Sequence, residues 1–511
     1  MTYTEDRPDA RESQSDTVWG RFAPIVLRLH FYAGLLVGPF LLIAALTGLA
    51  YALVGQVDAA VYRHELKVDS VGPQQLPLSQ QVSVATAAQP SGTVTSIRPP
   101  ANPDDTTRVV LTVPDVPEDY SRTVFVDPYS GEIRGTLTTY GEWLPVRAWF
   151  DELHRNLHLG AIGRNYSELA ASWLWVVALG GLFLWIGYRR RTGRLRRIAV
   201  PDRDATPRRR RLTWHGAVGV WIVVGLLALS VTGLTWSRYA GTNIGDLTQA
   251  IRPGLSTELD PASATPMTGH EHHGAAATSS GEPLAGINTV LQTVRDAGLR
   301  GPLWMTPPPA PNTAWLVSER KRSIPTQLDA ITVNPSSGEI TGRSNFSEWS
   351  LLQKSTEWAI DGHMGVLFGI PNQILVALIV IGLITVITRG YLMWWRRRPT
   401  KSGRWPVPPR RGGVLALKPL ELAILAVVVI GVGWFMPLLG ISLAAFLAID
   451  LAGGLVASRR GTAASGGRVI GGAQVSLPRC HLIKEHGTVL IGRRTAGPVV
   501  AQNQQREDQS E

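Results

Sequence analysis

The 511-residue chain contains a single cysteine, Cys480, and this scarcity excludes several classes of protein. One thiol cannot form a disulfide within the chain. It also cannot supply the clustered thiolates of iron–sulfur centres, covalent haem attachment or cysteine zinc sites. Any metal chemistry must therefore use histidine, methionine or carboxylate side chains, so a functional prediction depends mainly on the 11 histidines.

Nucleotide-binding and hydrolase motifs are also missing. No Gly-x-Gly-x-x-Gly run follows a predicted strand and no Walker A sequence is present, so nothing supports a nicotinamide or flavin site in this chain. A nucleophile elbow and a His-Glu-x-x-His motif are missing too. If electrons pass through this protein, they must enter from a quinol or from a separate cytoplasmic reductase.

Hydrophobic residues make up 44% of the chain and are concentrated in blocks. Four blocks reach about 20 residues, the length that crosses a bilayer. They are 29–54, 169–188, 216–236 and 373–394. The first block is too long for a signal-peptide core, so it is predicted to be a retained anchor. A further region, 420–456, is interrupted by Pro437 and Gly440 and is predicted to be a pair of helices.

The net charge of +11 comes largely from arginine clusters beside these blocks. The clusters lie between the second and third blocks, after the fourth block and after the last one. Lysine and arginine are enriched in cytoplasmic loops, so these connections and the N-terminus are predicted to be cytoplasmic. This topology explains the basic charge. Membrane lipid is therefore the expected partner, and no nucleic-acid partner is expected.

Two polar regions between the blocks carry matching landmarks. Short β-type runs at 109–113 and 123–126 precede the turn Asp127-Pro-Tyr-Ser-Gly-Glu-Ile, and Asn334-Pro-Ser-Ser-Gly-Glu-Ile repeats that turn. A Glu-Trp pair follows each turn, and each half ends in an apolar block and an arginine cluster. The pattern predicts an internal duplication of helix, outer α+β domain and helix.

The predicted fold is an α-helical integral membrane protein with four core helices, a C-terminal helix pair and two extracytoplasmic α+β domains. The helices are expected within 21–54, 151–188, 214–237, 351–395 and 420–457, and the ranges 151–188 and 351–395 each begin with a histidine-containing segment. The outer domains are 55–150 and 238–350. The leader 1–20, the basic loops 189–213 and 396–419 and the polar tail 458–511 are expected in the cytoplasm.

Three stretches resemble a known family. They are Leu29-His30-Phe-Tyr-Ala-Gly34, Leu153-His154-Arg-Asn-Leu-His158-Leu-Gly160 and the repeated Pro-x-Ser-Gly-Glu-Ile turn. Over residues 21–398 the chain resembles the PepSY-associated transmembrane helix family, iron-regulated bacterial inner-membrane proteins that include ferric-siderophore reductases. The resemblance implies PepSY-like outer domains and, in reductase members, bound b-type haem.

His30 and His215 open the first and third apolar blocks, and glycine follows each of them four residues later, at Gly34 and Gly219. A Thr-Gly-Leu run begins 17 residues after each histidine. Steps of four and 18 return to roughly the same helix face. An ionisable residue at such a position indicates function, whereas the alternative is a capped helix end with a small-residue packing stripe.

His158 and His363 precede the second and fourth apolar blocks, on the predicted outer side. Each side of the membrane then has two repeat-related histidines, and a low-spin haem needs two neutral imidazoles from opposite directions. We therefore expect two b-type haems, held by His30 with His215 and by His158 with His363. Glycine at 34 and 219 would allow a flat macrocycle to approach the backbone.

His154 lies one helical turn before His158, and Ala359 occupies the aligned position in the second half. His154 therefore remains an alternative to His158 as a ligand, or a proton donor or substrate contact. A separate cluster, His270, His272 and His273, lies in a low-complexity segment near 260–283. It is either a copper, zinc or nickel site or simply a linker.

The leading interpretation is a multi-pass protein of the bacterial cytoplasmic membrane that passes electrons outward and acts as a ferric-chelate (siderophore) reductase. Reduction weakens the hold of hard oxygen ligands on iron. The alternatives are a non-redox PepSY protein for binding or protease regulation, and metal handling through the histidine-rich loop. Haem absorbance separates the first interpretation from the other two.

Overall fold

The computed structural model describes residues 17–141, 143–251, 284–310, 313–321, 326–397, 409 and 413–466. The predictions for His270, His272 and His273, and for Cys480, lie outside these ranges. The chain divides into two compact units, Met1–Leu451 and Ala452–Glu511. The described part of the second unit is the C-terminal end of one helix.

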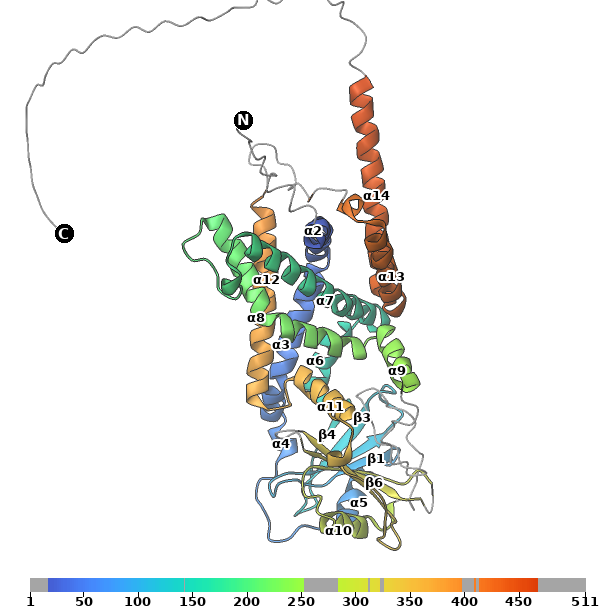
Figure 1. The fold of residues 1–511 in the computed structure, drawn as a ribbon. Coiled ribbons are helices and arrows are strands. Elements are labelled where there is room, and N and C mark those ends of the chain that lie inside the picture. The colour runs from blue at the N-terminus through green and yellow to red at the C-terminus, as the bar shows by residue number, and fades with distance from the viewer. Residues whose placement is uncertain are drawn as a thin grey trace, which may run out of the picture. The chain divides into compact units, whose positions relative to one another are not determined.

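Within the described ranges, five helices are long and apolar enough to cross a membrane. They are α3 (Gly38–Val61), α7 (Gly160–Arg191), α8 (Pro207–Thr235), α12 (Ile370–Trp395) and the stretch Pro437–Gly454 of α14 (Pro437–Gly466). The first four pack on one another (Figure 1) around a shared cluster of apolar side chains. The chain is therefore a multi-pass membrane protein, as its apolar blocks predict.

The first predicted span, 21–54, is two consecutive helices. α2 (Val18–Leu36) ends just before α3, and Val37 joins them. Pro39 occupies the first turn of α3, where a missing backbone N–H is tolerated. His30 therefore lies on α2, and Thr47 and Gly48 lie on α3.

The predicted segments before the second and fourth spans are separate short helices. α6 (Pro145–Asn156) precedes α7, and α11 (Leu351–Met364) precedes α12. α6 packs on α3, and α11 packs on α8. Each short helix ends with a residue of left-handed conformation, Leu157 at φ 56° and Gly365 at φ 79°.

The predicted basic loop 189–213 is shorter than expected because α7 ends at Arg191 and α8 begins at Pro207. The 3₁₀ helix η1 (Leu195–Arg197) lies in the connection. Arg189 is fully buried and pairs with Asp202 at 3.0 Å, which holds the connection against the end of α7. After α8, helix α9 (Ala240–Ile251) begins where Tyr239 and Ala240 donate backbone N–H groups to Glu168.

The C-terminal helix pair forms with its break at Pro437, as predicted. The 3₁₀ helix η4 (Gly413–Ala416) precedes α13 (Pro419–Phe435), and α14 follows. With 17 residues, α13 is shorter than the five spans. α14 continues to Gly466, so the first residues of the predicted polar tail, 458–466, are helical.

The polar regions form one continuous antiparallel sheet of eight strands. Its order is β4-β3-β2-β1-β5-β6-β7-β8. The first half consists of β1 (Thr93–Arg98), β2 (Thr107–Thr112), β3 (Ser121–Val126) and β4 (Ile133–Thr139). The second half consists of β5 (Leu303–Thr306), β6 (Trp315–Lys321), β7 (Gln327–Val333) and β8 (Ile340–Ser344). The sequence predicts two separate outer domains, whereas β1 pairs with β5 at Ile97 and Met305 and joins the halves.

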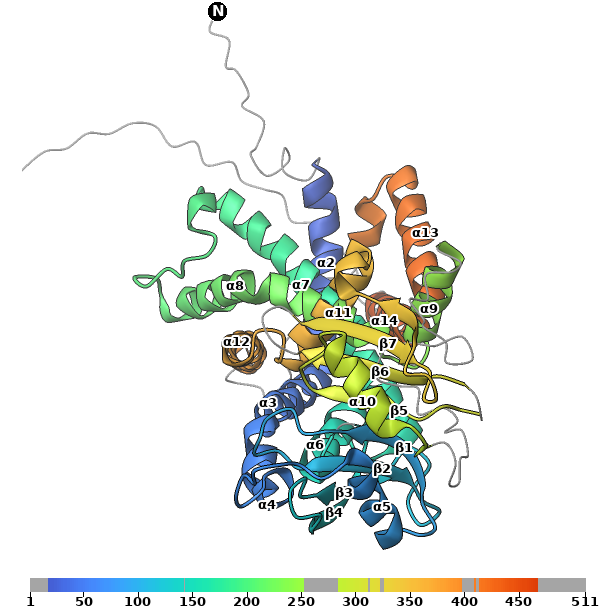
Figure 2. The same cartoon turned by 90° about the horizontal axis from the view of Figure 1, so that it is seen from below.

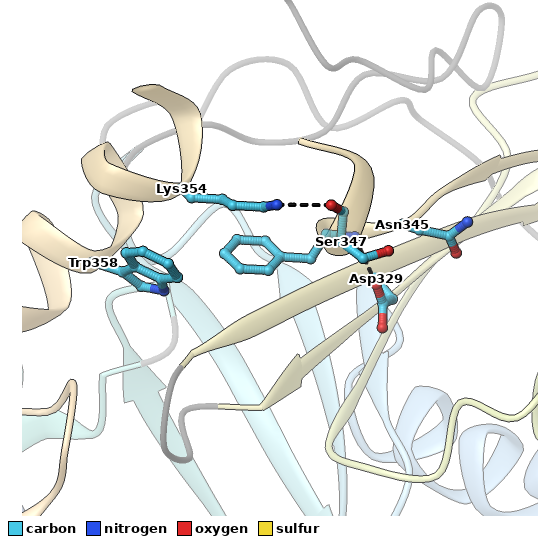
Figure 3. Close-up of a pocket in the computed structure, with 6 residues that line it drawn as sticks. Asp329, Asn345, Ser347, Lys354 and Trp358 are labelled. Carbon is cyan, nitrogen blue, oxygen red and sulfur yellow. Dashed lines mark hydrogen bonds between the residues drawn. The ribbon is translucent and has the colours of Figure 1, made fainter. Parts of the chain in front are cut away.

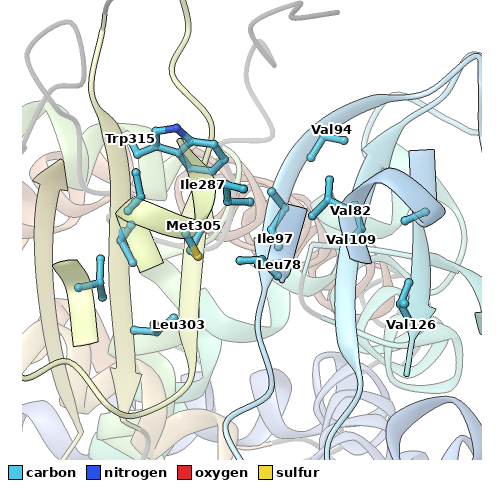
Figure 4. Close-up of a cluster of buried hydrophobic side chains, with 14 of the residues drawn as sticks. Leu78, Val82, Val94, Ile97, Val109, Val126, Ile287, Leu303, Met305 and Trp315 are labelled. Carbon is cyan, nitrogen blue, oxygen red and sulfur yellow. The ribbon is translucent and has the colours of Figure 1, made fainter. Parts of the chain in front are cut away.

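Two helices on one face explain why the halves join. α5 (Leu78–Ala88) and α10 (Ile287–Asp296) lie side by side against the sheet (Figure 2), and Ser79 and Asn288 exchange hydrogen bonds of 3.1 and 2.8 Å. Figure 4 shows apolar side chains of both halves meeting in a single cluster. Joining the halves buries apolar side chains where the two halves meet, and this burial is favourable.

Small elements connect the sheet to the spans. α4 (Arg63–Leu66) follows α3 and packs on β4, and η3 (Phe346–Glu348) lies between β8 and α11. Both predicted turns form. The Asp127 side chain accepts the N–H of Tyr129 at 2.8 Å, and Asn334 accepts that of Ser336 at 2.9 Å. Gly131 and Gly338 follow with φ of 76° and 70°, which favour glycine.

Candidate functional site

His30 of α2 and His215 of α8 meet between the spans. Their ring centroids are 6.4 Å apart, and the ring planes are inclined by 79°. His30 Nδ1 lies 3.1 Å from the Val177 carbonyl oxygen, and His215 Nδ1 lies 3.0 Å from that of Val386. A carbonyl oxygen only accepts, so each Nδ1 carries the hydrogen. Each Nε2 is left with a lone pair that can bind a metal.

The separation of these rings suits one metal ion between them. Metal–imidazole bonds in proteins are about 2.0 Å long, and the ring centre lies about 1.1 Å beyond the nitrogen. Two imidazoles on opposite sides of one ion therefore have centres about 6 Å apart. The observed 6.4 Å fits a haem iron ligated by both histidines.

Gly34 and Gly219, which the sequence predicts beside this pair, have the open space that a flat macrocycle would need. A Cβ built on Gly34 or on Gly219 would meet no atom within 4 Å. The glycines that contact the rings lie elsewhere. A Cβ on Gly181 would lie 2.9 Å from His30 Cε1, and one on Gly390 would lie 3.7 Å from His215 Cε1. The residues present therefore fit a flat macrocycle approaching along Gly34 and Gly219.

The second pair consists of His154 and His363, near the C-terminal ends of α6 and α11. His154 Nδ1 lies 3.0 Å from Thr47 Oγ1, and His363 Nδ1 lies 2.5 Å from Thr232 Oγ1. Both threonines donate their own hydrogen to a backbone carbonyl one turn earlier. The hydroxyl oxygens therefore accept from Nδ1–H, and Nε2 again keeps its lone pair.

Electrostatics favour the neutral form of this pair. α6 and α11 lie outside the five spans. Desolvation by the surrounding helices lowers the pKa of His154 to about 4, and it lowers the pKa of His363 to about 3, with a further contribution from the neighbouring His154. Both imidazoles are therefore neutral near pH 7, and neutral imidazole is the form that ligates metals.

His158 does not join His363, contrary to the favoured pairing. Its side chain is 30% exposed, its Nδ1 lies 3.1 Å from Glu152 Oε2, and its ring lies 4.9 Å from that of Trp149. The backbone explains this position, since φ is 55° at His158, in the break between α6 and α7. The break turns His158 away from the threonine that receives His154.

Matching intervals in the two halves identify His154 as the counterpart of His363. The carbonyl partner Val177 follows His154 at the same interval at which Val386 follows His363. Gly181 and Gly390, which lie next to the His30 and His215 rings, follow His154 and His363 at equal intervals as well. Aligning His158 with His363 removes both equalities, because His158 comes four residues after His154. The repeated Thr-Gly-Leu run contained the missing signal, since its threonines hold the two rings.

Aromatic residues not singled out in the sequence flank the second pair. The Tyr51 ring lies 6.4 Å from that of His154 at an interplanar angle of 14°, and the Trp236 ring lies 5.4 Å from that of His363 at 76°. Tyr51 follows His30 at the same interval at which Trp236 follows His215, so the predicted duplication would relate the two aromatic residues as well. Tyr51 Oη also lies 3.7 Å from Met364 Sδ.

A pocket of about 300 Å³ opens between the sheet and the N-terminal half of α11. Its lining is Asp329, Asn345, Phe346, Ser347, Lys354 and Trp358. Lys354 Nζ lies 5.9 Å from the centroid of the Phe346 ring. Figure 3 shows the same Nζ donating to the Ser347 carbonyl at 2.7 Å. Trp358 is five residues before His363, which corresponds to about 7.5 Å along a helix axis.

A protein-family model matches most of the chain. The family described as PepSY-associated TM region matches residues 27–397, more than two thirds of the chain. The matched region contains both histidine pairs, the eight-stranded sheet and the spans α3, α7, α8 and α12. No curated protein matches the sequence.

Proposed function

Because the chain belongs to the PepSY-associated TM region family, we propose that it is a b-type haem protein that carries electrons across the bacterial cytoplasmic membrane. The acceptor is ferric iron or a ferric siderophore on the outer side. His30 and His215 hold the inner haem, and His154 and His363 hold the outer one. The sequence analysis favoured His158 for the outer haem, and the proposal transfers that role to His154.

One observation carries the proposal. All four histidines bond through Nδ1 to a fixed acceptor, and the His30 and His215 rings stand 6.4 Å apart. Gly34 and Gly219, one helical turn along from these two histidines, have open space. Each Nε2 keeps its lone pair, and the His30 and His215 rings lie at a separation that suits two ligands of one iron. Oriented neutral imidazoles are what haem ligation requires.

The chain's own residues would set the properties of the bound groups. Haem supplies a one-electron carrier when bound. Val177, Val386, Thr47 and Thr232 fix the ring orientations and raise the basicity of Nε2. The apolar cluster of the four spans excludes water around the pairs. The electron donor would be a quinol or a cytoplasmic reductase.

The pocket beside α11 is the best candidate for the acceptor. Lys354 offers a cation and Trp358 an aromatic face, and both lie on the helix that carries His363. A one-electron reduction there would convert Fe(III) to Fe(II), which holds oxygen ligands more weakly. The ligand would then be released.

Substitution of one histidine per pair tests the proposal. We expect His215→Ala and His363→Ala each to lose about half of the haem absorbance of the purified protein, and the double variant to lose all of it. His158→Ala serves as the matched control and should keep the full spectrum. Full haem content in both His215→Ala and His363→Ala, with the chains still folded, would refute the assignment.

Two glycine substitutions that should preserve the fold test the same site. Gly34→Leu and Gly219→Leu place a side chain in open space, where the helix gains up to about 1 kcal/mol in propensity. As haem-free chains, both variants should melt no lower than haem-free wild type, and both should exclude the inner haem. Unchanged haem content in both would show that the space beside His30 and His215 is not the binding site.

A further inference from the structure

Arg147 of α6 lies seven residues before His154, on the same helix face and about 10 Å away along the axis. Tyr51 lies next to both residues. Its ring is 6.4 Å from the His154 ring, and the Arg147 Cζ atom is 5.3 Å from the Tyr51 ring centroid. The guanidinium and the imidazole therefore border one aromatic side chain on a common side of α6.

The guanidinium of Arg147 is only partly satisfied. It stacks on the Trp143 ring at 3.6 Å, and its Nη2 reaches Tyr51 Oη at 3.5 Å, the outer limit for a hydrogen bond. Its Nε is buried and has no hydrogen-bond partner among the described residues. A buried donor without a partner costs about 1–3 kcal/mol, so its persistence calls for an explanation.

The neighbouring acid does not provide that partner. Asp58 is buried, and its Oδ1 accepts the backbone N–H of Arg147 at 3.2 Å, which caps the first turn of α6. The Asp58 carboxylate thus positions the main chain of Arg147. The planar fork of the side chain remains available for a carboxylate that comes from outside the protein.

We propose that Arg147 forms a carboxylate-binding site that receives a propionate of the haem held by His154 and His363. The inference rests on the proposed function. A haem propionate is an anion attached to the macrocycle edge, and a guanidinium binds carboxylates through two parallel N–H···O bonds. Arg147 is thus a positioning residue, because it fixes the rotation of the macrocycle about the axis that joins the two histidines.

The second half has no equivalent cation. Seven residues before His363 stands Thr356, whose hydroxyl donates to the Leu352 carbonyl at 2.9 Å. The carboxylate site is therefore asymmetric even though the histidines repeat. This asymmetry would select one orientation of the macrocycle at the His154–His363 pair.

Haem dissociation from the full chain in detergent provides the test, with transfer to excess apomyoglobin as the readout. Arg147→Gln should release one of its two haems at least about tenfold faster, as expected for loss of a charge-assisted hydrogen bond. Arg155→Gln is the matched control, because it removes the same charge on the same helix. Arg147→Lys should restore part of the affinity, since it keeps the charge without the fork.

A second measurement identifies the carboxylate. Wild-type protein reconstituted with haem dimethyl ester should lose that haem as fast as Arg147→Gln does, and the substitution should then add nothing. Equal dissociation rates for Arg147→Gln and Arg155→Gln would overturn the inference, and so would ester haem that still responds to the substitution. A wild-type chain that binds no haem would refute the proposed function as well.

Discussion

At the scale of single residues, the acceptor that holds Nδ1 decides what each histidine can do. A histidine with a free Nδ1 can flip or change tautomer, whereas a fixed Nδ1–H leaves one lone pair in one direction. His30 and His215 use backbone carbonyls, and His154 and His363 use threonine hydroxyls. These contacts behind the rings would tune metal affinity without touching the metal.

The threonines give a direct test at this scale. Thr47→Val and Thr232→Val remove the oxygen that accepts from His154 or His363 and keep nearly the same volume. We expect haem affinity at that pair to fall about 10–100-fold, the usual cost of losing a hydrogen-bond partner of a metal-ligating histidine. Titration of the haem-free chain with hemin measures this affinity.

Thr385→Val is the control, because Thr385 donates to the Ile381 carbonyl within α12. Affinities for both threonine variants equal to that of Thr385→Val would show that the hydroxyls do not support ligation.

The sequence predicts His30, His215 and His363 as site residues because repeated spacing is visible without a structure. It does not resolve His154 from His158, since the choice depends on where α6 ends and on a left-handed φ at Leu157 and His158. Neither residue is glycine, and left-handed conformations are uncommon for other residues. The backbone preferences of these two residue types therefore do not predict this break.

At the scale of elements, glycines control how closely helices approach the rings. A Cβ on Gly48 would lie 2.9 Å from His154 Cε1, closer than real contacts allow, whereas one on Gly233 would lie 3.8 Å from His363 Cε1. The two glycines occupy matching places on α3 and α8, because Gly48 follows His30 at the same interval at which Gly233 follows His215. They therefore form a matched pair for experiment.

Gly48→Ala should displace the His154 ring from Thr47 and weaken haem binding at that pair, at a cost of about 1–3 kcal/mol for overpacking. Gly233→Ala should leave haem content unchanged and melt no lower than wild type, because its Cβ makes an ordinary contact. Haem content and melting temperature measure the two effects. Identical behaviour of the two variants would contradict the close packing of α3 on His154.

Element types follow from the sequence better than element boundaries do. Apolar length predicts the spans, and Pro437 predicts the break between α13 and α14. The division of the first span at Val37 and the separate helices α6 and α11 depend on packing against α3 and α8. The union of two sheet halves through Ile97 and Met305 depends on contacts between residues far apart in the chain.

At the scale of the whole molecule, the helices beyond the family match pack on the helix that carries His30. The match ends at residue 397, whereas Arg21 of α2 pairs with Glu421 of α13 at 2.5 Å, and Arg28 pairs with Asp450 of α14. Arg28 is buried and stands two residues before His30. The C-terminal helices therefore compensate a charge next to the His30–His215 pair.

Breaking this compensation should destabilise the chain. Asp450→Asn leaves the Arg28 cation without its carboxylate, and we expect a loss of about 1–3 kcal/mol. That is less than for a fully buried pair, because the Asp450 side chain is 24% exposed. Tryptophan fluorescence during thermal unfolding measures the change.

Asp204→Asn, at an exposed position, controls for the lost charge. The apolar double variant Arg28→Met with Asp450→Leu should recover most of the stability. An Asp450→Asn variant as stable as Asp204→Asn would show that the ion pair does not hold α14 to α2.

The most direct test of the central claim is a reduced-minus-oxidised absorbance spectrum of the purified full-length protein, with haem counted per chain. Two histidine pairs predict two b-type haems per chain and the spectrum of low-spin iron with two imidazole ligands. A purified, folded chain without a Soret band would contradict the proposal that these histidines hold haem.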